Sequence, residues 1–375
     1  TSDVVGLDTT VNVAKGIFEN CLDDEFRDIF IMPDYIGKMV KKNWLGAKTG
    51  SGFYKRIKNS RGKSSILSLD LETLEYKPTK KVVFDTIGSV KKIENISERF
   101  PVLIKGLDKA GEFYRRNFGS MFAYIQKRVP EICDEIYKVD DALKAGYGWQ
   151  FGPFEIWNSI GLEEGVNLLK SLGHKPSQWI NDMLQNNVNN FYSIENNKTT
   201  FYDLKSKKFK IKPGQESFIV LKNLHQNKTI WENKDSIIND LGDGIINVEF
   251  RSKMNTIGEG VLQGLNKSID IAEKDFGGLV IGNEGAHFSA GANLGMIFMM
   301  SVEQEYDEIN MAIKYFQDTM MRLRYSNIPT IAAPHGLTLG GGCELTMHCD
   351  KAIVNPETYI GLVEVGAGLI PGGGG

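Results

Sequence analysis

Two short apolar segments in the last third of the chain each run into a glycine-rich loop, and this arrangement constrains the fold more than any other feature. Residues 278–283 ("GLVIGN") precede the loop 287–295 ("HFSAGANLG"), and residues 328–334 ("IPTIAAP") precede the loop 339–344 ("LGGGCE"). The patterns "GEGVLQGLNKSIDIAEKDF" and "YDEINMAIKYFQDTMMRLRYSN" are helical. Strands that alternate with helices indicate an α/β domain, and ligands usually bind in the loops after its strands.

The two glycine-rich loops differ from phosphate-binding loops, since neither matches GxxxxGK[ST] or GxGxxG. Their small residues expose backbone N–H groups instead. Two N–H groups aimed at one point form an oxyanion hole, which stabilises a developing enolate or tetrahedral oxyanion. Small residues also let a carbonyl group approach the backbone closely.

Two glutamates lie close to these loops in the sequence. Glu344 directly follows the glycines, and Glu364 lies among apolar residues in "LVEVG". Two carboxylates beside a thioester carbonyl can add water across a neighbouring double bond, because one deprotonates the water and the other protonates the carbon α to the carbonyl. Glu344 can equally be an exposed residue at a helix N-terminus, and Glu364 a strand residue that faces water. Periodicity alone favours these simpler interpretations.

Composition narrows the function classes. A chain of 375 residues has room for two or three domains, and its net charge of -3 argues against a general nucleic-acid binder. It has no long uncharged apolar run and no signal peptide, so we expect a cytoplasmic protein without a membrane span.

Its scattered cysteines indicate reduced thiols, and its histidines lack metal-ligand spacing, so we expect no metal site. The chain lacks an initiator Met and ends in "PGGGG", so we expect an internal fragment of a longer protein.

The front half contains an internal echo. "VVGLDTTVNVAKGIF" is similar to "SIGLEEGVNLLKSLG", and Phe53–Tyr54 has a counterpart in Phe191–Tyr192. "LDLETLEYKP" is echoed by "YDLKSKKFKIKP" in the same order. We interpret this as two similar helical modules, each followed by a small hairpin-like extension. The alternative is coincidence between two amphipathic segments. Residues 185–240 are rich in Asn and Lys, and we expect them to form a connector.

The segments "HFSAGANLG", "IPTIAAPHGLTLGGGCELTMHCD" and "GLVEVGAGLIPGGGG" together resemble the enoyl-CoA hydratase (crotonase) superfamily. The resemblance implies an α/β spiral of ββα units that binds acyl-CoA, truncated in this chain. It makes the backbone N–H groups of Ala292 and Gly341 the oxyanion donors, and Glu344 and Glu364 the catalytic carboxylates. It also implies substrate contacts from five residues near the donors: Ala290, Gly291, Asn293, Leu294 and Gly340. Asn293 departs from the family pattern, which has Asp there.

The front segments "DVVGLDTTVNVA", "WLGAKTGSGFYK" and "YGWQFGPFEIWNSIGLE" resemble duplicated, all-α C-terminal domains of 3-hydroxyacyl-CoA dehydrogenases. The whole order resembles the bifunctional 3-hydroxyacyl-CoA dehydrogenase/enoyl-CoA hydratase fusion family of β-oxidation. The domain boundaries that follow are 1–88 and 89–195 for the two modules, 196–237 for a linker and 238–375 for the incomplete crotonase domain. In that family the NAD-binding domain precedes these modules. We therefore assign no NAD-binding or dehydrogenase catalytic residue here, expect no dehydrogenase activity from this chain alone, and interpret Lys48 and Glu155 as structural.

The resemblance implies hydration of trans-2-enoyl-CoA to 3-hydroxyacyl-CoA, with NAD-dependent dehydrogenation in the full-length protein. Enoyl-CoA isomerisation is one alternative, and an assembly or dimerisation module without activity is another. The family implies a homo-oligomer and allows a thiolase partner. Four apolar side chains are candidates for lining an acyl pocket, although such a cluster is more often core: Met296, Phe298, Met299 and Met300.

Overall fold

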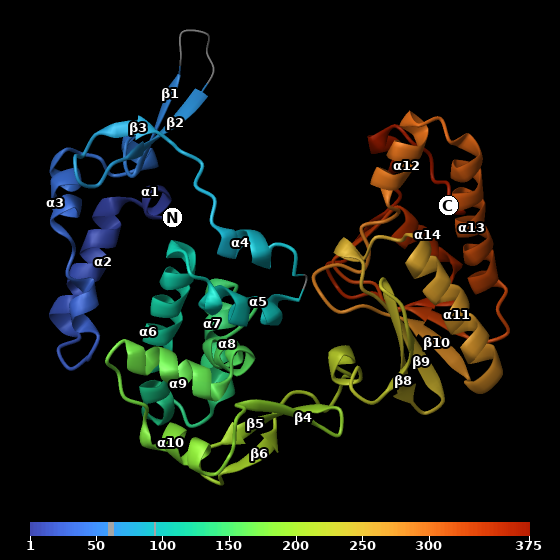
Figure 1. Cartoon of the computed structure of the whole chain (residues 1–375). Coiled ribbons are helices and arrows are strands. Elements are labelled where there is room, and N and C mark those ends of the chain that lie inside the picture. The colour runs from blue at the N-terminus through green and yellow to red at the C-terminus, as the bar shows by residue number, and fades with distance from the viewer. Residues whose placement is uncertain (59–63, 94) are drawn as a thin grey trace. The chain divides into compact units, whose positions relative to one another are not determined.

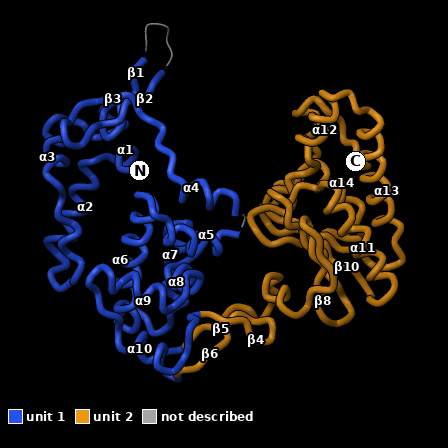
Figure 2. Tube along the Cα trace, in the orientation of Figure 1, with its two compact units in different colours: residues 1–191, 203–206 blue, residues 192–202, 207–375 orange. Residues whose placement is uncertain are grey.

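The computed structural model describes residues 1–58, 64–93 and 95–375. These residues form two compact units, which Figure 2 shows in different colours. Unit 1 comprises residues 1–191 and 203–206, and unit 2 comprises residues 192–202 and 207–375. We describe each unit by itself.

Unit 1 is mostly helical and carries one small sheet. Its first part contains α1 (Ser2–Val5), α2 (Leu7–Asn20), α3 (Asp34–Lys41) and an antiparallel sheet of β1 (Tyr54–Lys58), β2 (Ser64–Leu69) and β3 (Tyr76–Pro78). Its second part contains α4 (Asp85–Val90), α5 (Ile96–Lys105), α6 (Lys109–Glu131), α7 (Ile136–Tyr147), α8 (Pro153–Ile160), α9 (Leu162–Ser171) and α10 (Gln178–Gln185) (Figure 1). The first module is therefore mixed helix and sheet, not all-α, because the alternating segments around residues 64–78 pair as strands.

The two parts of unit 1 share a backbone pattern. Gly6 separates α1 from α2 with φ 106°, and Gly161 separates α8 from α9 with φ 102°, a region of backbone conformation that favours glycine. After α3, the Trp44 N–H donates to the Met39 carbonyl, with Asn43 at φ 57°. After α10, Val188 donates to Met183 in the same way, with Asn187 at φ 56°.

The matching positions also pack and bond alike. Three pairs of equivalent apolar side chains are buried: Leu7 and Leu162, Ile36 and Ile180, Met39 and Met183. The Asp3 carboxylate accepts a hydrogen bond from the Phe53 N–H, and the Asn158 side chain accepts one from the Phe191 N–H. A three-stranded sheet follows each helical part. These shared features support the duplication that the sequence echo predicts.

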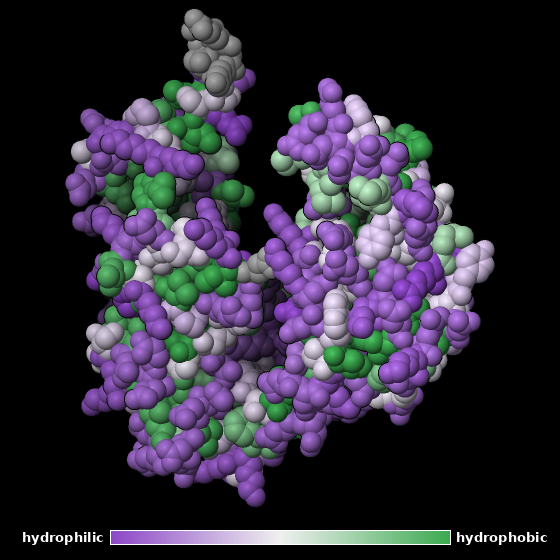
Figure 3. Space-filling model, turned by 45° about the vertical axis from the view of Figure 1, so that its right-hand side comes forward, coloured by the Kyte–Doolittle hydropathy of each residue, from purple (hydrophilic) through white to green (hydrophobic). Residues whose placement is uncertain are grey.

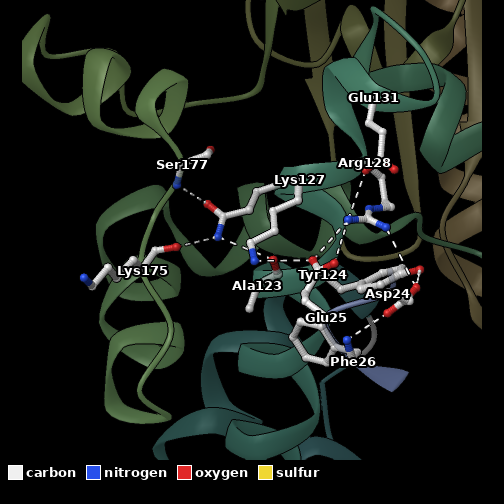
Figure 4. A network of polar contacts seen from close by, with 11 residues as sticks. Asp24, Glu25, Phe26, Ala123, Tyr124, Lys127, Arg128, Glu131, Lys175 and Ser177 are labelled. Atoms are coloured by element: carbon white, nitrogen blue, oxygen red, sulfur yellow. Dashed lines mark hydrogen bonds and ion pairs between the residues drawn. The ribbon is translucent and has the colours of Figure 1, made fainter. Parts of the chain in front are cut away.

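A network of polar contacts joins the loop after α2 to α6 within unit 1 (Figure 4). The Arg128 guanidinium pairs with Glu25 at 3.0 Å and with Asp24 at 3.9 Å. The Tyr124 hydroxyl donates to Asp24 at 2.8 Å, and Arg128 lies over the Tyr124 ring at 4.5 Å. The network thus ties the first helical part of the chain to the second.

Unit 2 is built on a six-stranded sheet in the order β13-β11-β10-β9-β8-β7. The strands β9 (Ile245–Phe250), β10 (Gly278–Ile281), β11 (Thr330–Ala332) and β13 (Lys351–Ala352) are parallel, while β7 (Thr229–Glu232) and β8 (Ser236–Gly242) pair antiparallel. A separate sheet contains β4 (Tyr192–Glu195), β5 (Lys198–Asp203) and β6 (Lys208–Ile211). Residues 196–237, which we expected to form a linker, therefore contain paired strands that include β7 of the main sheet.

Helices cover the main sheet of unit 2 and complete its core. α11 (Glu259–Asp275) contacts β8, β9 and β10, and α13 (Tyr306–Arg324) packs against α11, α12 (Leu294–Val302) and α14 (Gly341–His348). Buried side chains such as Leu265, Leu279 and Met320 form a continuous cluster between sheet and helices. The short parallel pair β12 (Leu337–Leu339) and β14 (Tyr359–Gly361) lies beside the start of α14. This α/β architecture matches the alternation of strands and helices in the sequence.

Hydrophilic and hydrophobic residues both reach the surface. On the face shown in Figure 3, hydrophobic residues form patches between larger hydrophilic areas. Within the described residues, every helix is too short or too polar to cross a membrane.

Candidate functional site

The candidate site of unit 2 is formed by two loops that run side by side after parallel strands. The Ser289 N–H donates to the Leu337 carbonyl, and the Leu339 N–H donates to the Ser289 carbonyl. On the other side, the Ile257 N–H donates to the Gly291 carbonyl. These bonds hold residues 289–293 next to β12, with Gly291 at φ 91° between them. The two glycine-rich segments that stand out in the sequence therefore meet in space.

The N–H groups of Ala292 and Gly341 lie close together. A Cβ added to Gly291 would lie 3.4 Å from the Gly341 nitrogen, and a Cβ added to Gly341 would lie 3.3 Å from the Ala292 nitrogen. Neither N–H donates to another described residue. Gly340, with φ 49° and ψ -120°, turns the chain so that α14 begins at this point. The arrangement presents two N–H donors at one place, as an oxyanion hole requires.

Glu344 lies in the first turn of α14 and its side chain is buried. Its Oε1 accepts hydrogen bonds from the Gly373 N–H at 2.7 Å and the Gly375 N–H at 3.0 Å. The interpretation of Glu344 as an exposed helix-terminal residue is therefore wrong. Burial became possible because backbone N–H groups from a distant part of the sequence satisfy the carboxylate.

Glu364 opens the 3₁₀ turn η5 (Glu364–Ala367) after β14, so it is not a strand residue. Its Oε1 approaches Gly340, where an added Cβ would lie only 2.8 Å away. Its Oε2 is buried and has no hydrogen-bond partner among the described residues. Burial raises the pKa of the Cys343 thiol, and the charges of Glu364 and Glu344 raise it further. Both carboxylates therefore lie within electrostatic reach of the same thiol.

The two donors and the two carboxylates line one cavity of about 810 Å³, a volume typical of small-molecule sites. The five residues that we expected to contact substrate also line it: Ala290, Gly291, Asn293, Leu294 and Gly340. Met296 and Met300 lie in its wall, whereas Phe298 and Met299 are exposed and do not line it. The cavity lining thus combines the two carboxylates and the backbone N–H groups with apolar side chains.

Comparison with known proteins agrees with this geometry. Residues 240–375 match the family described as enoyl-CoA hydratase/isomerase. Residues 240–375 belong to that family. We refer to this part of the chain as the hydratase/isomerase domain.

The whole chain is similar to longer proteins. It is 38% identical to a probable 3-hydroxyacyl-CoA dehydrogenase of Bacillus subtilis. It is 28% identical to a putative fatty acid oxidation complex trifunctional enzyme of Rickettsia felis. Each comparison covers 100% of this chain and 47% of the relative. The chain therefore spans about half the length of these relatives. An enoyl-CoA hydratase structure from Thermoplasma volcanium is 27% identical, covers 37% of this chain and 56% of that chain, and gives a TM-score of 0.34. These findings confirm what the sequence motifs predict: a hydratase/isomerase domain in a chain that is similar to a 3-hydroxyacyl-CoA dehydrogenase and to a trifunctional enzyme.

The sequence did not reveal every residue around the site of the hydratase/isomerase domain. Phe316, which the helical pattern of α13 placed in the core, lies partly in the core and partly in the cavity wall. Residues 369–373 also line the cavity. No local pattern in "LIPGGGG" marks these residues as neighbours of Glu344, since only the fold brings them together.

Lys48 and Glu155 hold local structure in unit 1. Lys48 pairs with Asp8, and this ion pair lowers the pKa of the Asp8 carboxyl. Glu155 accepts a hydrogen bond from the Gly152 N–H at 2.8 Å and thereby caps the start of α8, while Lys144 pairs with it at 2.7 Å. Across the described residues, no group of three or more His, Cys, Asp or Glu side chains is arranged to hold a metal ion.

Proposed function

We propose that the hydratase/isomerase domain hydrates trans-2-enoyl-CoA thioesters to 3-hydroxyacyl-CoA thioesters. The observation that carries this proposal is the convergence of two N–H donors and two carboxylates on one cavity. The donors of Ala292 and Gly341 have no acceptor among the described residues, so they are available to a thioester carbonyl. The relatives' names support the same substrate class.

The proposed reaction begins when the thioester oxygen accepts both N–H groups. One of the two carboxylates, Glu344 or Glu364, removes a proton from water, and the hydroxide oxygen forms a bond to the β-carbon. The electron pair of the double bond shifts to the α-carbon and the thioester oxygen, where the two donors stabilise the negative charge. The other glutamate, which enters the step protonated, gives its proton to the α-carbon, and transfer of the proton taken from water then restores both glutamates to their starting states. The products contain all atoms of the enoyl thioester and of one water molecule.

The free Oε2 of Glu364 supports this assignment. A buried carboxylate oxygen without a protein partner normally has a water or ligand next to it. The apolar wall that includes Met296 and Met300 provides a surface for the acyl chain. We place the thioester carbonyl at the two N–H donors and the acyl chain along this wall.

The glutamates provide the test of the proposed function. Glu344→Gln and Glu364→Gln keep the size of the side chains and remove their acid–base function. In the full-length protein, we expect each variant to hydrate crotonyl-CoA at least about a hundredfold more slowly than the unchanged protein, since general acid–base catalysis contributes this much. Loss of the enoyl thioester absorbance measures the rate. Undiminished hydration in both variants would rule out the assignment.

Isomerisation of a 3-enoyl-CoA is the second candidate, because the matched family includes both activities. It uses the same enolate and the same oxyanion donors, but it moves a proton and adds no water. The two carboxylates on one cavity favour hydration, since water addition needs both a base and an acid. Turnover of a 3-enoyl-CoA without turnover of the 2-enoyl-CoA would decide for the isomerase.

The longer protein is proposed to combine this reaction with a second one. The similarity to a probable 3-hydroxyacyl-CoA dehydrogenase supports NAD-dependent oxidation of the 3-hydroxyacyl-CoA product. We place the protein in the cytoplasm as a homo-oligomer, with a thiolase as a candidate partner. An assembly role for unit 1 makes a separate prediction, namely that light scattering will give a mass above that of one chain.

A further inference from the structure

His348 is a buried histidine that the proposed chemistry does not use. It is the last residue of α14, one helical turn after Glu344, and its side chain is 7% exposed. Its Nδ1 lies 2.7 Å from the backbone carbonyl oxygen of Glu344. Because a carbonyl oxygen only accepts hydrogen bonds, Nδ1 carries a hydrogen and donates it. The ring is thereby fixed on the same side of α14 as Glu344.

The other edge of the imidazole faces the glycine segment, which we define as residues 372–375. A Cβ added to Gly374 would lie 2.9 Å from Cε1 and 3.0 Å from Nε2 of His348. The ring therefore fills the space behind Gly374. Only a glycine can lie this close, and its φ of 127° is in a region that favours glycine as well.

The glycine segment contacts the proposed active site through Glu344. The N–H groups of Gly373 and Gly375, on either side of Gly374, both donate to Glu344 Oε1. Gln317 of α13 donates to the Gly372 carbonyl at 2.8 Å. Two side chains of α14 thus contact this segment: Glu344 accepts hydrogen bonds from Gly373 and Gly375, and His348 packs against Gly374.

We propose that His348 is a positioning residue, which holds the glycine segment where its N–H groups meet the Glu344 carboxylate. A run of glycines has high conformational freedom, so its placement depends on the surfaces around it. Removing the ring opens space behind Gly374 and lets the segment move away from Glu344. The effect on turnover rests on the proposed hydration, whereas the effect on the segment does not.

The test compares three variants of the purified protein. His348→Ala removes the ring, His348→Gln keeps a side chain that reaches about as far as Nε2, and Met347→Ala is a control on the neighbouring, exposed residue of the same helix. Hydrogen exchange followed by mass spectrometry reports on residues 372–375. We expect faster exchange there in His348→Ala, near-normal exchange in His348→Gln, and no change in Met347→Ala.

Crotonyl-CoA kinetics give the second readout. A misplacement of about 1 Å can cost two orders of magnitude in rate. We expect kcat of His348→Ala to fall at least about tenfold with KM within twofold, and His348→Gln to recover most of the loss. If His348→Ala does not fold, His348→Asn takes its place, since it retains a donor for the Glu344 carbonyl but is too short to support Gly374.

The outcomes separate the two proposals. Unchanged exchange in residues 372–375 of the Ala or Asn variant would overturn the role of His348, whatever the turnover. An unchanged protein that does not hydrate crotonyl-CoA would overturn the proposed function, while the exchange experiment would still decide on His348. Faster exchange with unchanged kcat would show that the segment moves without affecting Glu344, and this result would also contradict the positioning role.

Discussion

At the scale of single residues, Gly341 meets two demands at once. Its N–H is one of the two proposed oxyanion donors, and its Cα lies against Phe316 and the Ala292 backbone. A Cβ at this position would lie 2.9 Å from Phe316 Cζ and 3.3 Å from the Ala292 nitrogen. The space around this position therefore requires glycine, while the donor itself is the backbone N–H.

We predict that Gly341→Ala lowers kcat for crotonyl-CoA hydration about a hundredfold, because the added methyl group displaces one or both donors. Loss of an oxyanion donor typically costs about 2.7–4 kcal/mol of transition-state stabilisation. Gly361→Ala is the matched control, since a Cβ there meets no atom within 4 Å. Equal rates for the two variants would show that the donors of Ala292 and Gly341 are not used in catalysis.

At the scale of helices, Asp108 joins two elements of unit 1. It is the N-cap of α6, where it accepts a hydrogen bond from the Gly111 N–H at 3.0 Å. It also accepts bonds from the N–H and the hydroxyl of Thr86 in α4, at 3.0 and 2.7 Å. These bonds, with that of Gly111 the largest contribution, lower the pKa of Asp108 from 3.8 to about 2.

The lowered pKa predicts a dependence of stability on pH. Asp108 binds a proton more readily in the unfolded chain than in the folded one. Its contribution to the stability of the folded state is therefore complete above about pH 4 and is lost as pH falls to about 2. We expect Asp108→Asn to lower the thermal unfolding midpoint at pH 6 and to flatten its decline between pH 4 and 2. A decline as steep as in the unchanged protein would contradict the role of Asp108.

At the scale of the whole molecule, unit 1 depends on contacts between its two helical parts. Arg128 is central to these contacts, because its side chain is 14% exposed and pairs with residues of both parts. Glu25 of the first part and Glu131 of α6 both lie 3.0 Å from its guanidinium. Removal of the guanidinium would take a cationic partner away from Glu25 and Asp24, which are both partly buried.

We predict that Arg128→Met lowers the free energy of unfolding of unit 1 by about 2 kcal/mol, a value typical of hydrogen bonds to charged groups. Arg116→Met on the same helix is the control, because its ion pair with Glu112 is highly exposed and should contribute less than about 1 kcal/mol. Urea unfolding followed by circular dichroism measures both. Equal losses in the two variants would show that the network in Figure 4 does not stabilise the unit.

The sequence by itself predicted the α/β character of the last third, the internal echo and the two glycine-rich loops, because apolar periodicity and glycine clusters are local properties of the chain. Gly6 and Gly161, which the echo aligned, both lie between two helices with positive φ, so the similarity in sequence corresponds to a similar backbone. The echo predicted a hairpin-like extension at residues 202–213, where β6 and the end of β5 lie. Local patterns missed β7, because it is stabilised by pairing with β8.

The surroundings of the two glutamates depend on the three-dimensional fold. Periodicity favoured exposed side chains for both, since an isolated charge is normally solvated. The fold instead buries Glu344 under N–H groups that are about thirty residues away in sequence, and it places Glu364 against Gly340. Burial of a carboxylate depends on partners that come from other elements, and the pattern around the residue itself does not contain them.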